Sequence, residues 1–190
     1  MLPDDTLSSH SFPYSVLGGR ANGIGDLLDY ETGGVGIQDP SLGLTYQTWR
    51  ARYIAGHVVL DAPNVSTPIV VFTGDGVTEI SVSFTENMDY VLAYVQNGTA
   101  YLKWPNGGSY TTTSFGTDMK HPKVSLDEKR PIESNIADVL LAYIRDGNLC
   151  VRKQRDNYGV EIILSSVPNH RLIKFGMGTD NRVQFVLTRE

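Results

Sequence analysis

Four side chains in one segment of this sequence have the right chemistry to hold a metal ion. Asp118, His121, Asp127 and Glu128 supply the carboxylate and imidazole ligands that divalent cations accept. The same segment contains proline and several lysines, which is typical of a solvated loop, and the histidines of the chain form no local motif such as His-Glu-x-x-His. We therefore expect no metal site and no metal cofactor.

Two carboxylate pairs and one cysteine are the remaining candidates for catalysis. Glu86 precedes Asp89, and Glu133 precedes Asp138, in both cases where a strand is expected to begin. This position favours turn or sheet-edge roles over general acid–base chemistry. Cys150 lies within an apolar strand pattern, which favours a buried side chain over a nucleophile. The sequence thus predicts that the protein is not an enzyme and has no catalytic or cofactor-binding residues.

Aromatic side chains offer a possible binding chemistry. Trp49, Tyr101, Trp104 and Tyr110 could present ring faces to a sugar, although at strand spacing packing in the core or on a sheet face is the competing interpretation. Solvent exposure of Trp104 separates the two, because a buried indole argues against a sugar site.

Charged residues of alternating sign surround one expected hairpin. They are Arg145, Asp146, Arg152, Arg155 and Asp156. Cross-strand ion pairs account for this pattern, and a recognition surface is the alternative.

The elements that must position these side chains are β-strands. From residue 46 onward, short runs alternate apolar and polar residues between turn signals, and no segment shows a helical period. The runs at 90–95 and 139–144 are apolar on both faces, so each is expected inside a sheet that is covered on both sides. The predicted fold class is all-β.

An internal repeat organises these strands. The string DYVLAYVQNG (89–98) matches DVLLAYIRDG (138–147) without a gap. Asn97-Gly98 and Asp146-Gly147 are dipeptides that type I′ turns prefer, so each copy is predicted to be a hairpin. Weaker similarity around the hairpins indicates antiparallel, blade-like four-stranded units at about 72–114 and 115–174. The expected architecture is an incomplete β-propeller-like array or a β-sandwich.

The first forty residues differ from the rest. They are rich in glycine and carry scattered apolar side chains such as Phe12 and Tyr14. The glycines between 18 and 25 lack the preceding strand and the Lys-Ser/Thr of a phosphate-binding loop. We predict an extended N-terminal arm at 1–40, either a mobile terminus or a segment that orders on a neighbouring subunit, and an all-β domain at 41–190.

Composition narrows the classes of function. The chain has 190 residues, of which 41% are hydrophobic and 19% charged, and its formal net charge is -5. This balance argues against nucleic-acid binding, and no apolar run approaches the ~20 residues of a membrane span. The single cysteine excludes an internal disulfide, and the first residues lack the pattern of a secretory signal. Synthesis in a cytoplasm is expected.

Three strings resemble a known group of proteins. NIADVLLAYIRDGNLCVRKQRD (135–156), YQTWRARY (46–53) and VLDAP (59–63) are similar to stretches of uncharacterised virion proteins of tailed bacteriophages. The resemblance covers about residues 44–165. Cys150 stands where an aromatic is expected, and Lys153 where Gln or Arg is commoner. The resemblance implies a structural component of the virion, in the tail or neck, with other virion proteins as partners.

Three functional hypotheses follow. The first is a non-enzymatic virion protein that is made in the host cytoplasm, forms homo-oligomers, and builds a ring or attaches fibres. The second is a glycan- or receptor-binding β module on the phage tail. The third is a glycosidase of the propeller kind, which requires two carboxylates that converge in a cleft.

Overall fold

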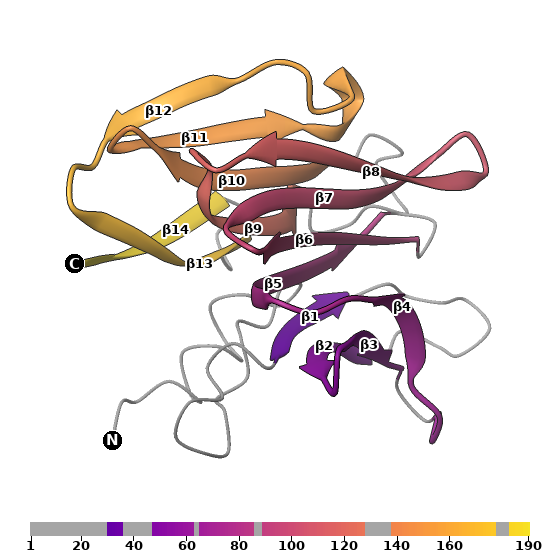
Figure 1. The fold of residues 1–190 in the computed structure, drawn as a ribbon. Helices are drawn as coiled ribbons and strands as arrows, with labels where there is room; N and C mark the ends of the chain where they lie inside the picture. Colours follow the sequence, from indigo (N-terminus) through magenta and orange to yellow (C-terminus); the bar gives the residue numbers. More distant parts are fainter. Residues whose placement is uncertain (1–29, 36–46, 63–64, 86–88, 128–137, 178–182) are drawn as a thin grey trace.

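The computed structural model describes residues 30–35, 47–62, 65–85, 89–127, 138–177 and 183–190. These residues form fourteen β-strands and one short 3-10 helix (Figure 1). The elements are β1 (Tyr30–Val35), β2 (Gln47–Ile54), β3 (His57–Asp61), β4 (Ile69–Thr73), β5 (Val77–Phe84), β6 (Tyr90–Gln96), β7 (Thr99–Asn106), β8 (Ser109–Gly116), β9 (Lys120–Leu126), β10 (Val139–Arg145), β11 (Asn148–Lys153), η2 (Gln154–Asp156), β12 (Ile162–Ser166), β13 (His170–Met177) and β14 (Val183–Arg189).

The strands pair in chain order as antiparallel meanders. Sheet 1 is β1-β2-β3-β4, sheet 2 is β5-β6-β7-β8, and sheet 3 is β9-β10-β11-β12. Sheet 4 is the β13-β14 hairpin. The all-β fold with blade-like four-stranded repeats is therefore confirmed.

The first strand of each sheet adjoins the first strand of the next. β1 contacts β5, β5 contacts β9, and β9 contacts β13. No comparably extensive contact joins β13 back to β1 among the described strands. The sheets thus form an open series, with sheet 2 between sheets 1 and 3 (Figure 1).

The core consists of three apolar clusters, one between each pair of successive sheets. Strand β10 shows how this arises. Leu141 and Tyr143 face the cluster shared with sheet 2, whereas Leu140 and Ile144 face the cluster shared with sheet 4. Because neighbouring side chains on a strand point to opposite faces, a strand between two such clusters must be apolar throughout. The predicted two-sided burial of β10 is confirmed.

Strand β6 follows the same rule in sheet 2. Val91, Ala93 and Val95 pack toward sheet 3, and Leu92 and Tyr94 pack toward sheet 1.

The repeated hairpin turns have the predicted backbone conformation. Asn97-Gly98 has φ angles of 50° and 77°, and Asp146-Gly147 has 50° and 70°. A third copy occurs in sheet 1, where Ala55 has a φ angle of 50° and Gly56 of 78°. A short turn is expected here between the strands at 46–53 and 56–60, but alanine is unusual at such a position, so the sequence did not indicate the turn type.

The N-terminal boundary of the β domain differs from the prediction. Tyr30–Val35, within the expected arm, forms β1 and pairs with β2 from Tyr30 opposite Arg52 to Val35 opposite Gln47. Strand pairing uses backbone groups, so the glycine-rich β1 pairs without the alternation that identifies other strands. The rest of the predicted arm lies outside the described residues.

The unit boundaries also shift. The strands of sheet 2 span 77–116 and those of sheet 3 span 120–166, because β4 closes sheet 1 and β13 opens sheet 4.

Candidate functional site

A pocket of about 510 Å³ lies between corresponding ends of sheets 2 and 3. Its lining residues come from the adjoining ends of β7 and β8 with the turn between them, from η2 and the residue after it, and from positions that flank β5, β6 and β10. Sheet 2 contributes Thr85, Asp89, Trp104, Pro105, Asn106, Gly107, Gly108, Ser109 and Tyr110, and sheet 3 contributes Asp138, Gln154, Arg155 and Asn157.

The two aspartates of this pocket occupy equivalent places in the repeat. The N–H of Asp89 donates to Thr85 Oγ1 at 3.2 Å, and the N–H of Asp138 donates to Asp127 Oδ1 at 2.8 Å. In return, Thr85 N–H donates to the Asp89 carbonyl and Asp127 N–H to the Asp138 carbonyl. One local arrangement, used twice, therefore places Asp89 and Asp138 on the pocket.

Asp138 is held by Arg155. Its carboxylate is 7% exposed; it accepts the backbone N–H of Arg155 at 3.0 Å and forms an ion pair with the guanidinium Nε. Arg155 Nη2 also lies 3.9 Å from Asp127 Oδ2. Burial raises the pKa of Asp127, and the negative charge of Asp138 raises it further. The hydrogen bond from Asp138 N–H lowers this pKa but does not cancel the increase. Arg155 thus offsets the acidic charge on this wall.

Arg152 anchors the segment that follows η2, the short helix that forms one wall of the pocket. Its Nη1 donates to the carbonyls of Tyr158 at 2.8 Å and Gly159 at 2.9 Å. Asn157 takes the left-handed conformation that ends η2, with φ 49°. Gln154 Oε1 accepts the N–H of Val139 at 3.2 Å. These contacts hold the turn in place beside the pocket.

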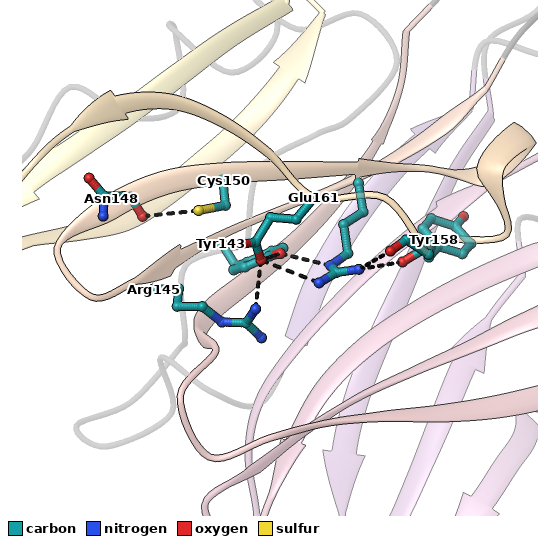
Figure 2. A network of polar contacts seen from close by, with 8 residues as sticks. Tyr143, Arg145, Asn148, Cys150, Tyr158 and Glu161 are labelled. Atoms are coloured by element: carbon teal, nitrogen blue, oxygen red, sulfur yellow. Dashed lines mark hydrogen bonds and ion pairs between the residues drawn. The ribbon is translucent and has the colours of Figure 1, made fainter.

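Arg152 belongs to a larger polar network (Figure 2). Tyr143 O–H donates to Glu161, and Arg152 Nε donates to Tyr143 Oη at 2.8 Å. Glu161 also accepts Arg145 Nη1 at 2.7 Å and Arg152 Nη2 at 3.3 Å. Burial raises the pKa of Tyr143, and its hydrogen bond to Glu161 raises it further. Apart from Arg145 Nε, which is buried without a partner among the described residues, these groups bond to one another, which indicates a structural role that ties β10 and β11 to the segment before β12.

This network accounts for the charged hairpin noted in the sequence. Ion pairs do form, but their acidic partners are Glu161, Asp127 and Asp138 rather than Asp146 and Asp156. Glu161 lies beyond the hairpin, so the pattern of alternating charges did not point to it.

Two of the four candidate sugar-binding aromatics line the pocket. Trp104 is 6% exposed, donates Nε1–H to Thr113 Oγ1 at 3.3 Å, and lies edge-on to Tyr158. This burial argues against the indole as a stacking surface for a sugar. Tyr110 is 38% exposed and stacks on Tyr90, with ring centroids 4.1 Å apart. Its hydroxyl accepts the N–H of Tyr90 at 3.1 Å.

The other two aromatics lie elsewhere. Trp49 packs on Phe84, and Tyr101 stacks on Tyr94, both in the cluster between sheets 1 and 2.

The metal-ligand candidates do not converge in the described part of the chain. His121 Nδ1 lies 3.0 Å from Glu79 Oε1 and its Nε2 lies 3.3 Å from Glu190 Oε1, while Asp118 is exposed. Asp127 faces Asp138 N–H, and Glu128 lies outside the described residues. No group of three potential metal-ligating side chains occurs among the residues that were described.

Of the carboxylate pairs, Asp89 and Asp138 line the pocket. Their partners Glu86 and Glu133 lie outside the described residues. Cys150 is 1% exposed, and burial raises the pKa of its thiol. The prediction of a buried strand cysteine is confirmed.

The sequence did not identify most of the pocket. Asn106–Ser109 and Gln154–Asn157 are ordinary turn residues in the sequence, and only the packing of sheet 2 on sheet 3 brings them together. The positive φ angles of Gly107 and Gly108 reflect the Gly-Gly signal of a tight turn, which was available in the sequence.

Comparison with protein-family models, with curated proteins and with solved structures finds no match. Within the described residues, no helix has the length and apolar character that a membrane span needs.

Proposed function

We propose that this chain is a non-enzymatic structural component of a tailed-phage virion, in the tail or neck, and that it joins neighbouring subunits through the outer strands of its sheets. The observation that carries the proposal is the exposed apolar edge formed by β12.

Strand β12 is the outermost strand of sheet 3, and all five of its residues are exposed. Ile162, Ile163 and Leu164 are 36%, 63% and 48% exposed, and the strand contains no charged residue. Edge strands of monomeric proteins usually carry charges, proline or bulges that prevent pairing with other chains. Of these protective features, β12 has only a bulge at Leu164. An exposed apolar edge of this kind is expected to be covered by a neighbouring subunit.

The outer strand of sheet 1 has similar character. Ile69 and Val70 of β4 are 46% and 58% exposed, and β4 also lacks charge. In contrast, β8 in sheet 2 exposes the polar residues Ser109, Thr112 and Ser114, and Tyr110 is its one exposed large apolar side chain. Apolar exposure is thus concentrated on particular edges, as expected of contact surfaces.

The resemblance to virion proteins supports the phage assignment. Its longest string, residues 135–156, includes η2 and the two central strands of sheet 3, β10 and β11. This part of the chain positions β12, so the resemblance and the exposed edge concern the same sheet.

The first test is the mass of the purified protein by light scattering, for the natural sequence and for Ile163→Lys. A defined oligomer that becomes a monomer in Ile163→Lys supports pairing through β12, because a lysine on the edge opposes strand addition. Ser114→Lys, at an exposed position of the β8 edge, is the matched control and should keep the oligomer. Equal loss in both variants would contradict a specific role for β12.

The second test concerns the virion. Particles from the phage or prophage that encodes this chain would be purified on a density gradient and examined with antibodies against residues 47–190. Labelling at the tail or neck supports the proposal. Absence of the protein from purified particles would overturn it.

The role of the N-terminal segment needs a deletion that ends at residue 29. A longer deletion would remove β1 and expose the edge of β2. If removal of residues 1–29 leaves the β domain folded and abolishes the oligomer, the arm mediates assembly.

A further inference from the structure

The pocket between sheets 2 and 3 includes no residue of the exposed edges β12 and β4, and its lining has a distinct chemistry. Ten of its thirteen lining residues carry hydrogen-bonding side chains: Thr85, Asp89, Trp104, Asn106, Ser109, Tyr110, Asp138, Gln154, Arg155 and Asn157. Buried polar groups without partners are costly, so an apolar ligand would fit poorly here. A ligand that offers hydrogen bonds in many directions would fit well.

The charge balance further restricts the ligand. Asp89 and Asp138 both line the pocket, and Asp127 lies behind Asp138. The cation of the lining, Arg155, is already engaged by Asp138 and Asp127. An anionic ligand would therefore meet uncompensated negative charge, whereas an uncharged ligand would not.

Two groups at the pocket are available for such a ligand. Neither the Asp89 carboxylate nor the Asn157 side-chain amide has a hydrogen-bond partner among the residues described in the structure. Both residues are exposed at the pocket. A carboxylate and an amide offer acceptors and a donor for the hydroxyl groups of a polyol.

The turn at Gly107-Gly108 leaves room for a close approach to the backbone. Both glycines have positive φ angles, and a Cβ built on either would meet no atom within 4 Å. Their surroundings are open, so a ligand could reach the backbone groups of this turn. A volume of about 510 Å³ is within the range of small-molecule sites.

We propose that this pocket binds an uncharged saccharide, whose hydroxyl groups donate to the Asp89 carboxylate and form hydrogen bonds with the Asn157 amide and the Asn106–Ser109 turn. Because Trp104 is buried, this is not the aromatic sugar site that the sequence suggested, and the saccharide is held by polar groups rather than by stacking on the indole. The inference is independent of the assembly role, because no pocket residue belongs to β12 or β4.

The test begins with an array of neutral, sialylated and sulfated oligosaccharides, followed by calorimetric titration with the neutral oligosaccharide that binds best. We expect binding of neutral members. In Asp89→Asn the dissociation constant should rise roughly tenfold, as expected for a lost hydrogen bond to a charged group. Asn157→Gly removes the amide, retains the left-handed backbone that glycine tolerates, and should also weaken binding.

The matched control is Asp146→Asn, a carboxylate-to-amide change at a hairpin turn that is not part of the pocket lining. Asparagine is favoured at that turn position, so affinity and fold should both be preserved. Near-ultraviolet circular dichroism would verify folding of each variant. Absence of any neutral binding, binding only of acidic oligosaccharides, or unchanged affinity in both pocket variants would overturn the proposal.

Discussion

His121 Nδ1 lies 3.0 Å from Glu79 Oε1, and this contact joins the first strands of sheets 2 and 3. The same imidazole places Nε2 3.3 Å from Glu190, the residue after β14. The His121 cluster, defined as Glu79, His121 and Glu190, therefore connects sheets 2, 3 and 4 through side-chain contacts.

Stability should fall in acid as Glu79 becomes protonated. Burial opposes ionisation of Glu79, but the hydrogen bond and charge of His121, together with Lys123 and Arg171, outweigh it and hold the pKa below its usual value. A lowered carboxyl pKa in the folded state gives stability that is present above about pH 4.3, the ordinary glutamate value, and is lost as pH falls through the lower folded value.

Urea unfolding of the natural protein and Glu79→Gln between pH 3 and 6 would measure this effect. At pH 6 the variant should be less stable by roughly 1–3 kcal/mol, and the difference should shrink toward pH 3. A constant difference across this range would show that Glu79 acts without its charge.

Two buried tyrosines should respond in opposite ways to loss of the hydroxyl group. Tyr143 Oη bonds with Glu161 and Arg152, so Tyr143→Phe removes both bonds and deprives Arg152 Nε of its acceptor, which should destabilise the fold by about 1–3 kcal/mol. Tyr158 Oη is buried and has no hydrogen-bond partner among the described residues, so Tyr158→Phe should be neutral or stabilising. Denaturant unfolding of both variants at pH 7 is the measurement. An equal loss in the two would indicate that Tyr158 Oη has a partner in solution, such as a bound water.

The third hairpin turn predicts a reciprocal pair of substitutions. Ala55 and Asn97 occupy the same turn position at φ 50°, where a left-handed backbone costs alanine about 1–2 kcal/mol and asparagine less. Ala55→Asn should therefore stabilise the protein, and Asn97→Ala should destabilise it. Thermal unfolding of the two single variants measures both effects. Shifts of the same sign would contradict equivalence of the turns.

The cluster between sheets 2 and 3 should dominate stability. Leu141 is fully buried there, so Leu141→Ala should cost about 2–5 kcal/mol. Leu164 on the β12 edge is 48% exposed and is the matched control, expected to change stability little in the monomer. Guanidinium unfolding below the concentration at which oligomers form would compare them.

The sequence predicted those parts of the fold that have a local signal. Strands β6 and β10 are apolar on both faces because each is packed between two clusters. The dipeptides Asn97-Gly98 and Asp146-Gly147 are typical of type I′ turns, and both turns have the expected positive φ angles. In contrast, β1 was not predicted, because its glycines interrupt the alternation of apolar and polar side chains that identifies a strand.

The pocket depends on contacts between distant residues. Asn106 and Asn157 line the same pocket only because sheets 2 and 3 pack together. The partner of Arg145 and Arg152 was missed for the same reason, since Glu161 carries no pattern that links it to them.

The open series of sheets has a consequence for how the molecule comes apart. Sheets 2 and 3 each share a cluster with two neighbours, while sheet 4 shares one and consists of a single hairpin. In such a one-dimensional array, each unit draws its stability from the neighbours it touches, and a two-stranded unit at one end has the least. Amide hydrogens of β13 and β14 should therefore exchange through local opening well before those of β6 and β10, so that loss of structure proceeds inward from sheet 4.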